Sequence, residues 1–265
     1  MEPFVALMRR YCIDYTNRHD QSVCDEIMHP DYVVHISGVD LPRDAAYKPA
    51  VSRVFARFPG LGLQVHELVT NGERLAMRFS EHGASPEAGG RVAVWAGIGL
   101  YRWNGRQLLE NFVEQDFLAQ EAQLAGAAPA PLEPPHVDPW LGTRAVAADP
   151  QAEAVTRAWL ANGDLRDARQ VVIDGSWYEG LAPSPIEVAA VTIDDLFTAG
   201  DRVAFHVTQA GVYRGGLPGV PDELVGRAVA LRCAGLVRAL GGAVAEVRAV
   251  TDRAGVRAAL LRGHR

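Results

Sequence analysis

Apolar residues near the N-terminus recur with the spacing of an α-helix. They are Val5, Leu7, Met8, Tyr11, Cys12 and Tyr15. Spacing of i, i+3, i+4 predicts an amphipathic helix that buries this stripe. A second short helix is expected at QSVCDEIM, before the strand-like run DYVVHIS. A third is expected at DAAYKPAVSRVFARF, where Pro59 and Gly60 end it.

The pattern then changes to that of β-strands. Strands are predicted near residues 63–69, 74–81, 92–103 and 108–115. The turn sequences TNGE and WNGR separate them, and Asn-Gly strongly favours a tight hairpin. A last helix is predicted after Asp116. Helices followed by hairpin-connected strands indicate the α+β class.

The same order of elements occurs a second time. Aligned without gaps, residues 68–83 and 196–211 share six identities in 16 pairs, and residues 90–124 and 226–260 share ten in 35. Unrelated sequences of ordinary composition would share about one in fifteen. The chain is therefore interpreted as a first copy, residues 1–124, and a second copy, residues 151–265. The second copy has only about a dozen residues where the third helix would stand, so we expect that helix to be missing.

Residues 125–150 separate the copies. This segment contains six prolines among alanines and shows no apolar period. Such a composition is typical of a semi-rigid, extended linker.

The sequence resembles the SnoaL-like branch of the NTF2-like superfamily, which includes polyketide ester cyclases. In the first copy the resemblance depends on DYVVHISG, FPGLGLQVHELVTNGERLAMRFSEHG and LLENFVEQDFLAQEAQL, and in the second on GDRVAFHVTQAGVYRGGLPGVPDELVGRAVAL. It implies two tandem cones, each a curved antiparallel sheet wrapped around helices, with a degenerate second copy. Family members usually dimerise through the convex sheet face. The two copies are therefore expected to pack back to back as a pseudo-dimer, and homodimerisation of the whole chain is left open.

Composition excludes several kinds of partner. A formal net charge of −6 makes nucleic acids and anionic membranes poor partners. No stretch approaches the roughly 18 unbroken apolar residues of a membrane span, and the apolar run before Arg9 is too short for a signal peptide. Three cysteines without C-x-x-C spacing suit a reducing compartment, so a cytoplasmic location is expected.

The duplication provides an internal control for candidate residues. A residue kept in both copies, such as Glu110 or Asp116, is expected to serve folding, and Asp116 is placed to cap the last helix. Ionisable and aromatic residues found in the first copy alone are candidates for chemistry. They are His35, Arg78, Glu81, His82, Trp95, Tyr101 and Glu114. We therefore predict that the first copy carries the site and that the second cone is filled.

The resemblance implies a histidine at the end of the first strand that points into the cone, and His35 matches that position. The alternative is a half-buried histidine bonded to backbone. Glu81 and His82 are adjacent on a strand, so only one can point inward, and we favour Glu81. The catalytic candidates are His35, Glu81, His82, Glu114 and Asp116.

The resemblance also implies an aspartate after a tryptophan on the last strand, but Phe112 and Val113 stand there. Glu114 is the neighbouring acid, and it faces away from Val113 unless the strand has a bulge. If the face with Asn111 and Gln115 lines the cone, those amides can only orient a ligand. The substrate-binding candidates are Phe55, Phe58, Arg78, Trp95, Tyr101 and Asn111.

Two classes of function remain open. The first is a cofactor-free acid/base enzyme, of cyclase, isomerase, dehydratase or hydrolase type. It would act on an apolar cyclic molecule such as a polyketide or steroid-like compound, with a carboxylate whose pKa is raised by apolar walls. The second is a non-catalytic module that binds a similar ligand or serves as a scaffold. The sequence has no spacing typical of a metal site or phosphate loop.

Overall fold

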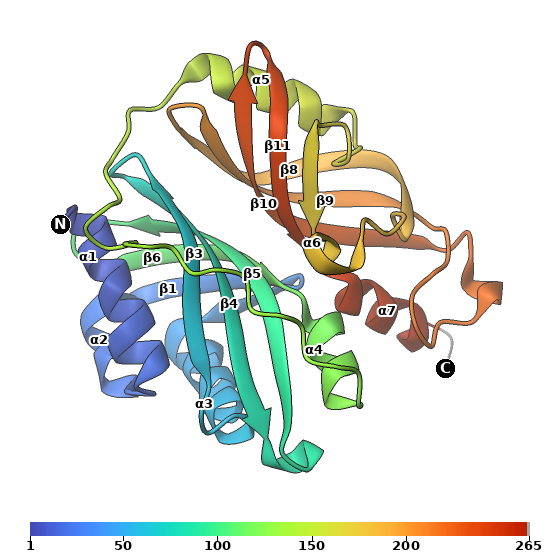
Figure 1. Ribbon diagram of the computed structural model, residues 1–265, viewed down its shortest axis with the longest axis horizontal. Coiled ribbons are helices and arrows are strands. Elements are labelled where there is room, and N and C mark those ends of the chain that lie inside the picture. Colours follow the sequence, from blue (N-terminus) through green and yellow to red (C-terminus); the bar gives the residue numbers. More distant parts are fainter. Residues whose placement is uncertain (264–265) are drawn as a thin grey trace.

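The computed structural model describes residues 1–263, which form two β-sheets packed back to back, each with its own helices (Figure 1). The first sheet has six strands in the order β2-β1-β6-β5-β4-β3. The second has five in the order β7-β11-β10-β9-β8. Both copies thus have the α+β architecture expected from the sequence.

The first copy contains the three predicted helical regions, the predicted strands and the last helix. Its helices are α1 (Pro3–Arg9), α2 (Cys24–Ile27), α3 (Lys48–Arg57) and α4 (Phe117–Leu124). A π-helix at Arg10–Asn17 continues α1, and a π-helical turn at Arg43–Tyr47 precedes α3. Its strands are β1 (Met28–Ile36), β2 (Val39–Pro42), β3 (Gly62–Thr70), β4 (Arg74–Ser85), β5 (Arg91–Trp103) and β6 (Leu108–Gln115). The short edge strand β2 was not predicted.

The second copy is a reduced version of the first. Its helices are α5 (Pro150–Ala161), α6 (Ser176–Glu179) and α7 (Arg253–Arg262). Its strands are β7 (Gln170–Ile173), β8 (Ile186–Ala199), β9 (Arg202–Tyr213), β10 (Ala228–Leu240) and β11 (Ala243–Thr251). The four-residue helix α6 stands where the first copy has α3, so the expected loss of the third helix is confirmed.

Each sheet is mixed rather than wholly antiparallel, which corrects the expectation from the resemblance. β1 pairs in parallel with β6, and β7 pairs in parallel with β11. In the first copy α3 carries the chain from β2 at one edge of the sheet to β3 at the other. The antiparallel strands β3 to β6 then cross the sheet back towards β1. The last of them, β6, lies beside β1 and runs in the same direction.

The convex faces of the two sheets form one apolar interface. It contains Val69, Ala76, Ile98 and Leu100 of the first copy and Phe197, Ala199, Ala204, Ala234, Leu236 and Val250 of the second. Ion pairs at its edge repeat with the internal symmetry, because Arg74 pairs with Asp195 and Arg202 pairs with Glu67. The 128-residue offset relates Glu67 to Asp195 and Arg74 to Arg202, so the two ion pairs are equivalent to each other. The copies therefore pack as a pseudo-dimer.

The linker crosses from one copy to the other along β3. The amide of His136 donates to the carbonyl of Val65 at 2.9 Å, and that of Val146 donates to Thr70 at 3.0 Å. Gly200 of the second copy donates to Ala147 at 2.8 Å, and Trp140 packs against the first core. The linker is thus extended but attached at several points.

Across residues 1–263 we find no helix with both the length and the apolar character required to traverse a bilayer.

Candidate functional site

The concave side of the first sheet encloses a cavity of about 900 Å³. Its walls come from α3, from the π-helix after α1 and from the inward faces of β3 to β6. Apolar and aromatic side chains dominate these walls, among them Phe55, Phe58, Leu63, Phe79, Trp95 and Val113. A volume of this size accommodates a multi-ring organic molecule.

Strand alternation and two glycines on β5 help to leave this space open. Trp95 and Tyr101 face inward, and Gly97 and Gly99 lie between them on the same face. The ring of Phe79 lies so close to Gly97 that an added Cβ would stand 2.4 Å from it. A larger residue at Gly97 would therefore push Phe79 into the cavity.

Glu81 is an acid of β4 that lines the cavity. It stands opposite Trp95 in the register of β4 and β5 and forms no ion pair within residues 1–263. Burial raises its pKa to about 7, and the nearby indole of Trp95 opposes this shift only partly. The indole N–H of Trp95 also donates to Gln115 at 2.8 Å. The pKa of the Glu81 carboxyl therefore lies near neutral pH, at the wall of the cavity.

Tyrosine hydroxyls supply hydrogen-bond donors in the same cavity. Tyr11 and Tyr47 share one hydrogen bond of 3.1 Å, which leaves one of their two hydroxyl hydrogens free. The buried Tyr15 hydroxyl and the Asn111 carbonyl oxygen have no partner among the described residues. Burial raises the pKa values of Tyr11, Tyr15 and Tyr47, so these hydroxyls stay protonated.

His35 lies outside the cavity, contrary to the expected inward direction. Its neighbours Val34 and Ile36 line the cavity, so its ring projects from the other face of β1. There Nδ1 lies 2.7 Å from Asp40 and Nε2 lies 3.2 Å from Glu110. The ring stacks on Phe112 with centroids 4.2 Å apart.

Glu114 and Asp116 face the second copy. Glu114 is fully buried, 3.1 Å from Nε2 of His206 and 3.3 Å from the amide of Ser37. Asp116 caps α4 by accepting from the amide of Ala119 at 3.2 Å, and it binds Arg253 through both oxygens. Both acids therefore join the two copies.

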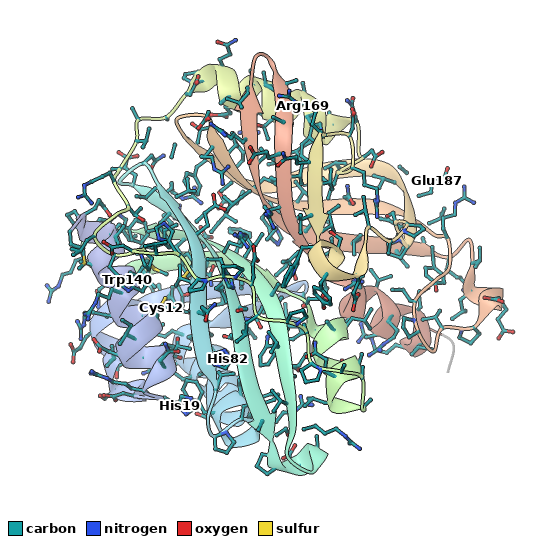
Figure 2. All side chains as sticks on the ribbon, viewed as in Figure 1. Cys12, His19, His82, Trp140, Arg169 and Glu187 are labelled. Carbon is teal, nitrogen blue, oxygen red and sulfur yellow. The ribbon has the colours of Figure 1, made fainter. Side chains whose placement is uncertain are left out.

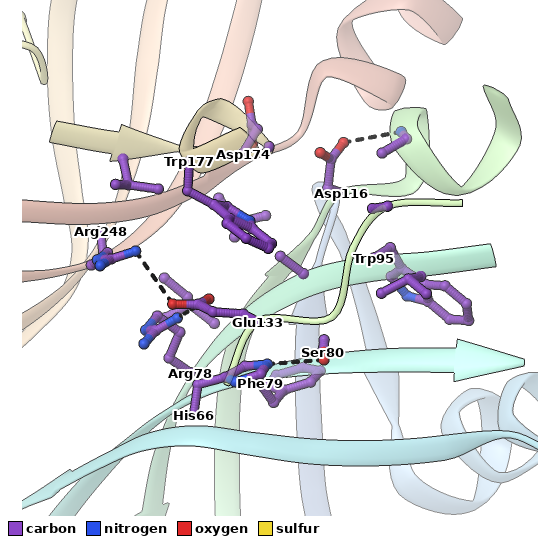
Figure 3. Close-up of a pocket in the computed structure, with 18 of the residues that line it drawn as sticks. His66, Arg78, Phe79, Ser80, Trp95, Asp116, Glu133, Asp174, Trp177 and Arg248 are labelled. Atoms are coloured by element: carbon purple, nitrogen blue, oxygen red, sulfur yellow. Dashed lines mark hydrogen bonds and ion pairs between the residues drawn. The ribbon is translucent and has the colours of Figure 1, made fainter. Parts of the chain in front are cut away.

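His82 and Arg78 also lie away from the cavity lining. The His82 ring packs over Gly62 of β3, near the lower end of the first sheet in Figure 2. Arg78 binds the linker carboxylate Glu133 at 2.5 Å, and Arg248 of the second copy reaches Glu133 at 3.4 Å (Figure 3). These arginines border a small pocket of about 50 Å³ between the copies.

Only Glu81 of the catalytic candidates lines the cavity. Five substrate-binding candidates line it as well, namely Phe55, Phe58, Trp95, Tyr101 and Asn111. Sequence reasoning missed the tyrosines, because Tyr11 and Tyr15 belong to a helical stripe that reads as ordinary core. Arg232 of the second copy was also missed, since it aligns with Ala96 and only folding brings it to this cavity.

The second cone is only partly filled. Trp159 and Phe205 occupy its core with ring centroids 6.0 Å apart. A hollow of about 460 Å³ remains, lined in part by α6, β8 and β9, which corrects the expectation of a filled cone. Gln209 stands there in place of Glu81 and donates to the carbonyl of Gly163 at 2.9 Å. The hollow therefore has no ionisable group at the position of Glu81.

Within residues 1–263, no three His, Cys, Asp or Glu side chains are grouped so that they could hold a metal ion.

Comparisons with known proteins place a family match in the first copy. The family model described as SnoaL-like domain matches residues 8–111. A search of curated protein sequences found no match. Among solved structures, IdmH of Streptomyces antibioticus, a proposed polyketide cyclase, is 19% identical, with a TM-score of 0.42, over 47% of this chain and 99% of its own. AclR of Streptomyces galilaeus, a proposed hydroxylase, is 18% identical over 47% and 98%, with a TM-score of 0.42. TsrD of Streptomyces laurentii is 22% identical over 47% and 96%, with a TM-score of 0.40.

Proposed function

We propose that the first copy, whose residues 8–111 match the SnoaL-like domain family, is a cofactor-independent acid/base enzyme for an apolar cyclic molecule. The observation that carries the proposal is Glu81, a carboxylate with a pKa of about 7 in a cavity of about 900 Å³. A group that titrates near the working pH both accepts and returns protons efficiently.

The reaction that fits this site best is proton transfer next to a carbonyl group. Ionised Glu81 would take a proton from the carbon beside the carbonyl, and the C–H electron pair would form an enolate. The free hydroxyl hydrogen of the Tyr11–Tyr47 pair would donate to the enolate oxygen, where negative charge develops. The cavity walls would exclude water and strengthen this hydrogen bond.

Two outcomes conserve atoms and charge from that enolate. In an isomerisation, protonated Glu81 returns its proton to a different carbon of the same molecule. In a ring closure, the enolate carbon attacks a second carbonyl of the substrate, and the resulting alkoxide takes the proton from Glu81. Both outcomes regenerate the carboxylate.

A non-catalytic binding module is the second candidate. The observation that favours it is Val113, which lines the cavity where the resemblance expects an acid. In that case Glu81 and the tyrosines would orient a ligand without transferring a proton.

The two candidates differ in their effect on 2-tetralone, a cyclic ketone with exchangeable hydrogens beside its carbonyl. We expect the wild-type protein to accelerate exchange of these hydrogens in D₂O, measured by proton NMR. Glu81→Gln should lower the rate of this exchange by about 10²–10⁴-fold. Glu87→Gln, which changes an exposed glutamate in a 3₁₀ turn, is the matched control and should keep the full rate. If 2-tetralone stabilises the wild type against heat but is not exchanged, the binding module is the better description.

A further inference from the structure

The second copy forms part of the wall of the first copy's cavity. At one end the cavity is bounded by residues of the β1–β2 hairpin and by Arg232, Asp252 and α7 of the second copy. The hairpin residues are Ser37, Gly38, Val39 and Leu41. We call this end the mouth. The site proposed above is therefore composite.

Arg232 brings an unpaired cation to the mouth. It shares the convex face of β10 with Ala234 and Leu236, which pack in the interface between the copies. Its guanidinium lies against Gly38, and an added Cβ there would stand 2.3 Å from the guanidinium carbon. The guanidinium is half-buried, yet it has no hydrogen bond or ion pair within residues 1–263.

Other arginines between the copies are paired, which makes Arg232 unusual. Arg74 binds Asp195, Arg202 binds Glu67, and Arg253 binds Asp116. Two acids, Asp194 and Asp252, interact with Arg232 electrostatically without a direct hydrogen bond or ion pair. Each also has other partners, although Oδ2 of Asp252 has none among the described residues. Asp194 accepts from His206 at 2.9 Å, and Asp252 accepts from Gly255 at 2.8 Å and from Ser37 at 3.1 Å. A half-buried guanidinium without a partner is a binding group for an external anion.

The mouth carries an excess of positive charge. Arg262 of α7 lies there with Arg232, and Arg57 of α3 also lines the cavity. Arg57 and Arg262 form no ion pair within the described residues. Besides Glu81, two acids line the cavity: Glu121 is paired with Arg257, and Asp252 interacts electrostatically with Arg232. A positive mouth on a chain of net charge −6 attracts anions locally.

We propose that Arg232 binds a carboxylate of the ligand, so that the cavity selects apolar cyclic acids over their neutral analogues. This inference rests on the proposed function and names the substrate class of the same site. β5 and β6 separate β4, which carries Glu81, from β1, which ends two residues before Gly38. Three strand spacings amount to roughly 14 Å along the sheet. The carboxylate and the reacting carbon therefore lie at opposite ends of an extended molecule.

The test compares 4-(1-pyrenyl)butyrate with its methyl ester by fluorescence titration. The wild-type protein should bind the acid at least about tenfold more tightly than the ester, since a charge-assisted hydrogen bond is lost in the ester. Arg232→Gln should remove this preference and leave the affinity for the ester unchanged. Arg169→Gln is the matched control, because Arg169 is exposed and lies at the far end of the second copy in Figure 2.

A second variant tests the position of the guanidinium as well as its charge. Gly38→Ala places a methyl group against Arg232 and should also weaken acid binding, with circular dichroism used to verify folding. Equal affinity of the wild type for acid and ester would overturn the inference, as would binding of neither compound. Exchange of the uncharged 2-tetralone tests the proposed function separately, so the two can fail independently.

Discussion

At the residue scale, the ionisation of Glu81 connects the free energy of unfolding to the proton transfer proposed for this residue. The carboxylate faces a cavity lined by Phe79 and Trp95, and desolvation raises its pKa from 4.5 to about 7. A folded-state pKa above the unfolded value means that the folded protein holds the proton longer. The free energy of unfolding therefore falls as pH rises from 4.5 to 7. The same desolvation that supports the proposed proton transfer by Glu81 destabilises the fold at neutral pH.

This linkage predicts that Glu81→Gln, the variant expected to lose the proposed proton transfer, stabilises the protein. At pH 8 the variant should be more stable than the wild type by up to about 3 kcal/mol, because a neutral amide avoids the cost of the buried charge. At pH 5 the difference should be small, since Glu81 is then mostly protonated in the folded state. Urea unfolding at both pH values measures the effect. An equal difference at pH 5 and pH 8 would contradict the raised pKa.

Comparison of the copies singled out Glu81, which lines the cavity, but also Glu114, which does not. Glu114 is found in the first copy alone because its partner, His206, is found in the second alone. Such asymmetry arises wherever two copies pack face to face and adapt to one another. Sequence differences between the copies therefore mark interface pairs as well as candidates for chemistry. Glu81 and Glu114 are distinguished by the face of the sheet on which each side chain lies, the concave face for Glu81 and the interface for Glu114.

At the element scale, β5 controls the volume of the cavity. Gly97→Ala should displace Phe79 into the cavity and destabilise the fold by about 1–3 kcal/mol through overpacking. It should also weaken binding of pyrenylbutyrate methyl ester, which does not depend on a carboxylate. Thermal unfolding and fluorescence titration measure the two effects.

The second copy offers a matched control for this substitution. Gly235 lies under Phe205 with the same geometry, and an added Cβ would stand 2.3 Å from that ring. Phe205 belongs to the core of the second copy and does not line the cavity of the first. Gly235→Ala should therefore cost similar stability without weakening the binding of the ester. Loss of ester affinity in both variants would mean that binding reports general destabilisation.

The elements themselves were largely predictable from the sequence. Helical spacing and the Asn-Gly turns located α3 and the strands β3 to β6 to within a few residues. The edge strand β2 was missed because its four residues end at Pro42 and show no alternation. The parallel pairing of β1 with β6 is not encoded in local periodicity, since it depends on where α3 returns the chain.

At the scale of the whole molecule, the two copies retain the geometry of a symmetric dimer. Their reciprocal ion pairs and the shared apolar face repeat with the internal offset, as expected for a self-complementary interface. The second copy thus covers the sheet of the first and adds Arg232 to its cavity. Loss of α3 from the second copy leaves both contributions intact.

This symmetry predicts that residues 1–124 alone form a homodimer through the convex face of the sheet. Ile98 and Leu100 would otherwise be exposed to water, and burying such a face drives association. His206 corresponds to Arg78 in the first copy, so Glu114 would meet Arg78 of the partner subunit in place of His206. Arg74 would likewise meet Glu67 of the partner subunit. Size-exclusion chromatography with light scattering should therefore give a dimer, and Leu100→Arg should give a monomer or an aggregate. A folded, monomeric wild-type fragment would show that the interface depends on features present only in the second copy.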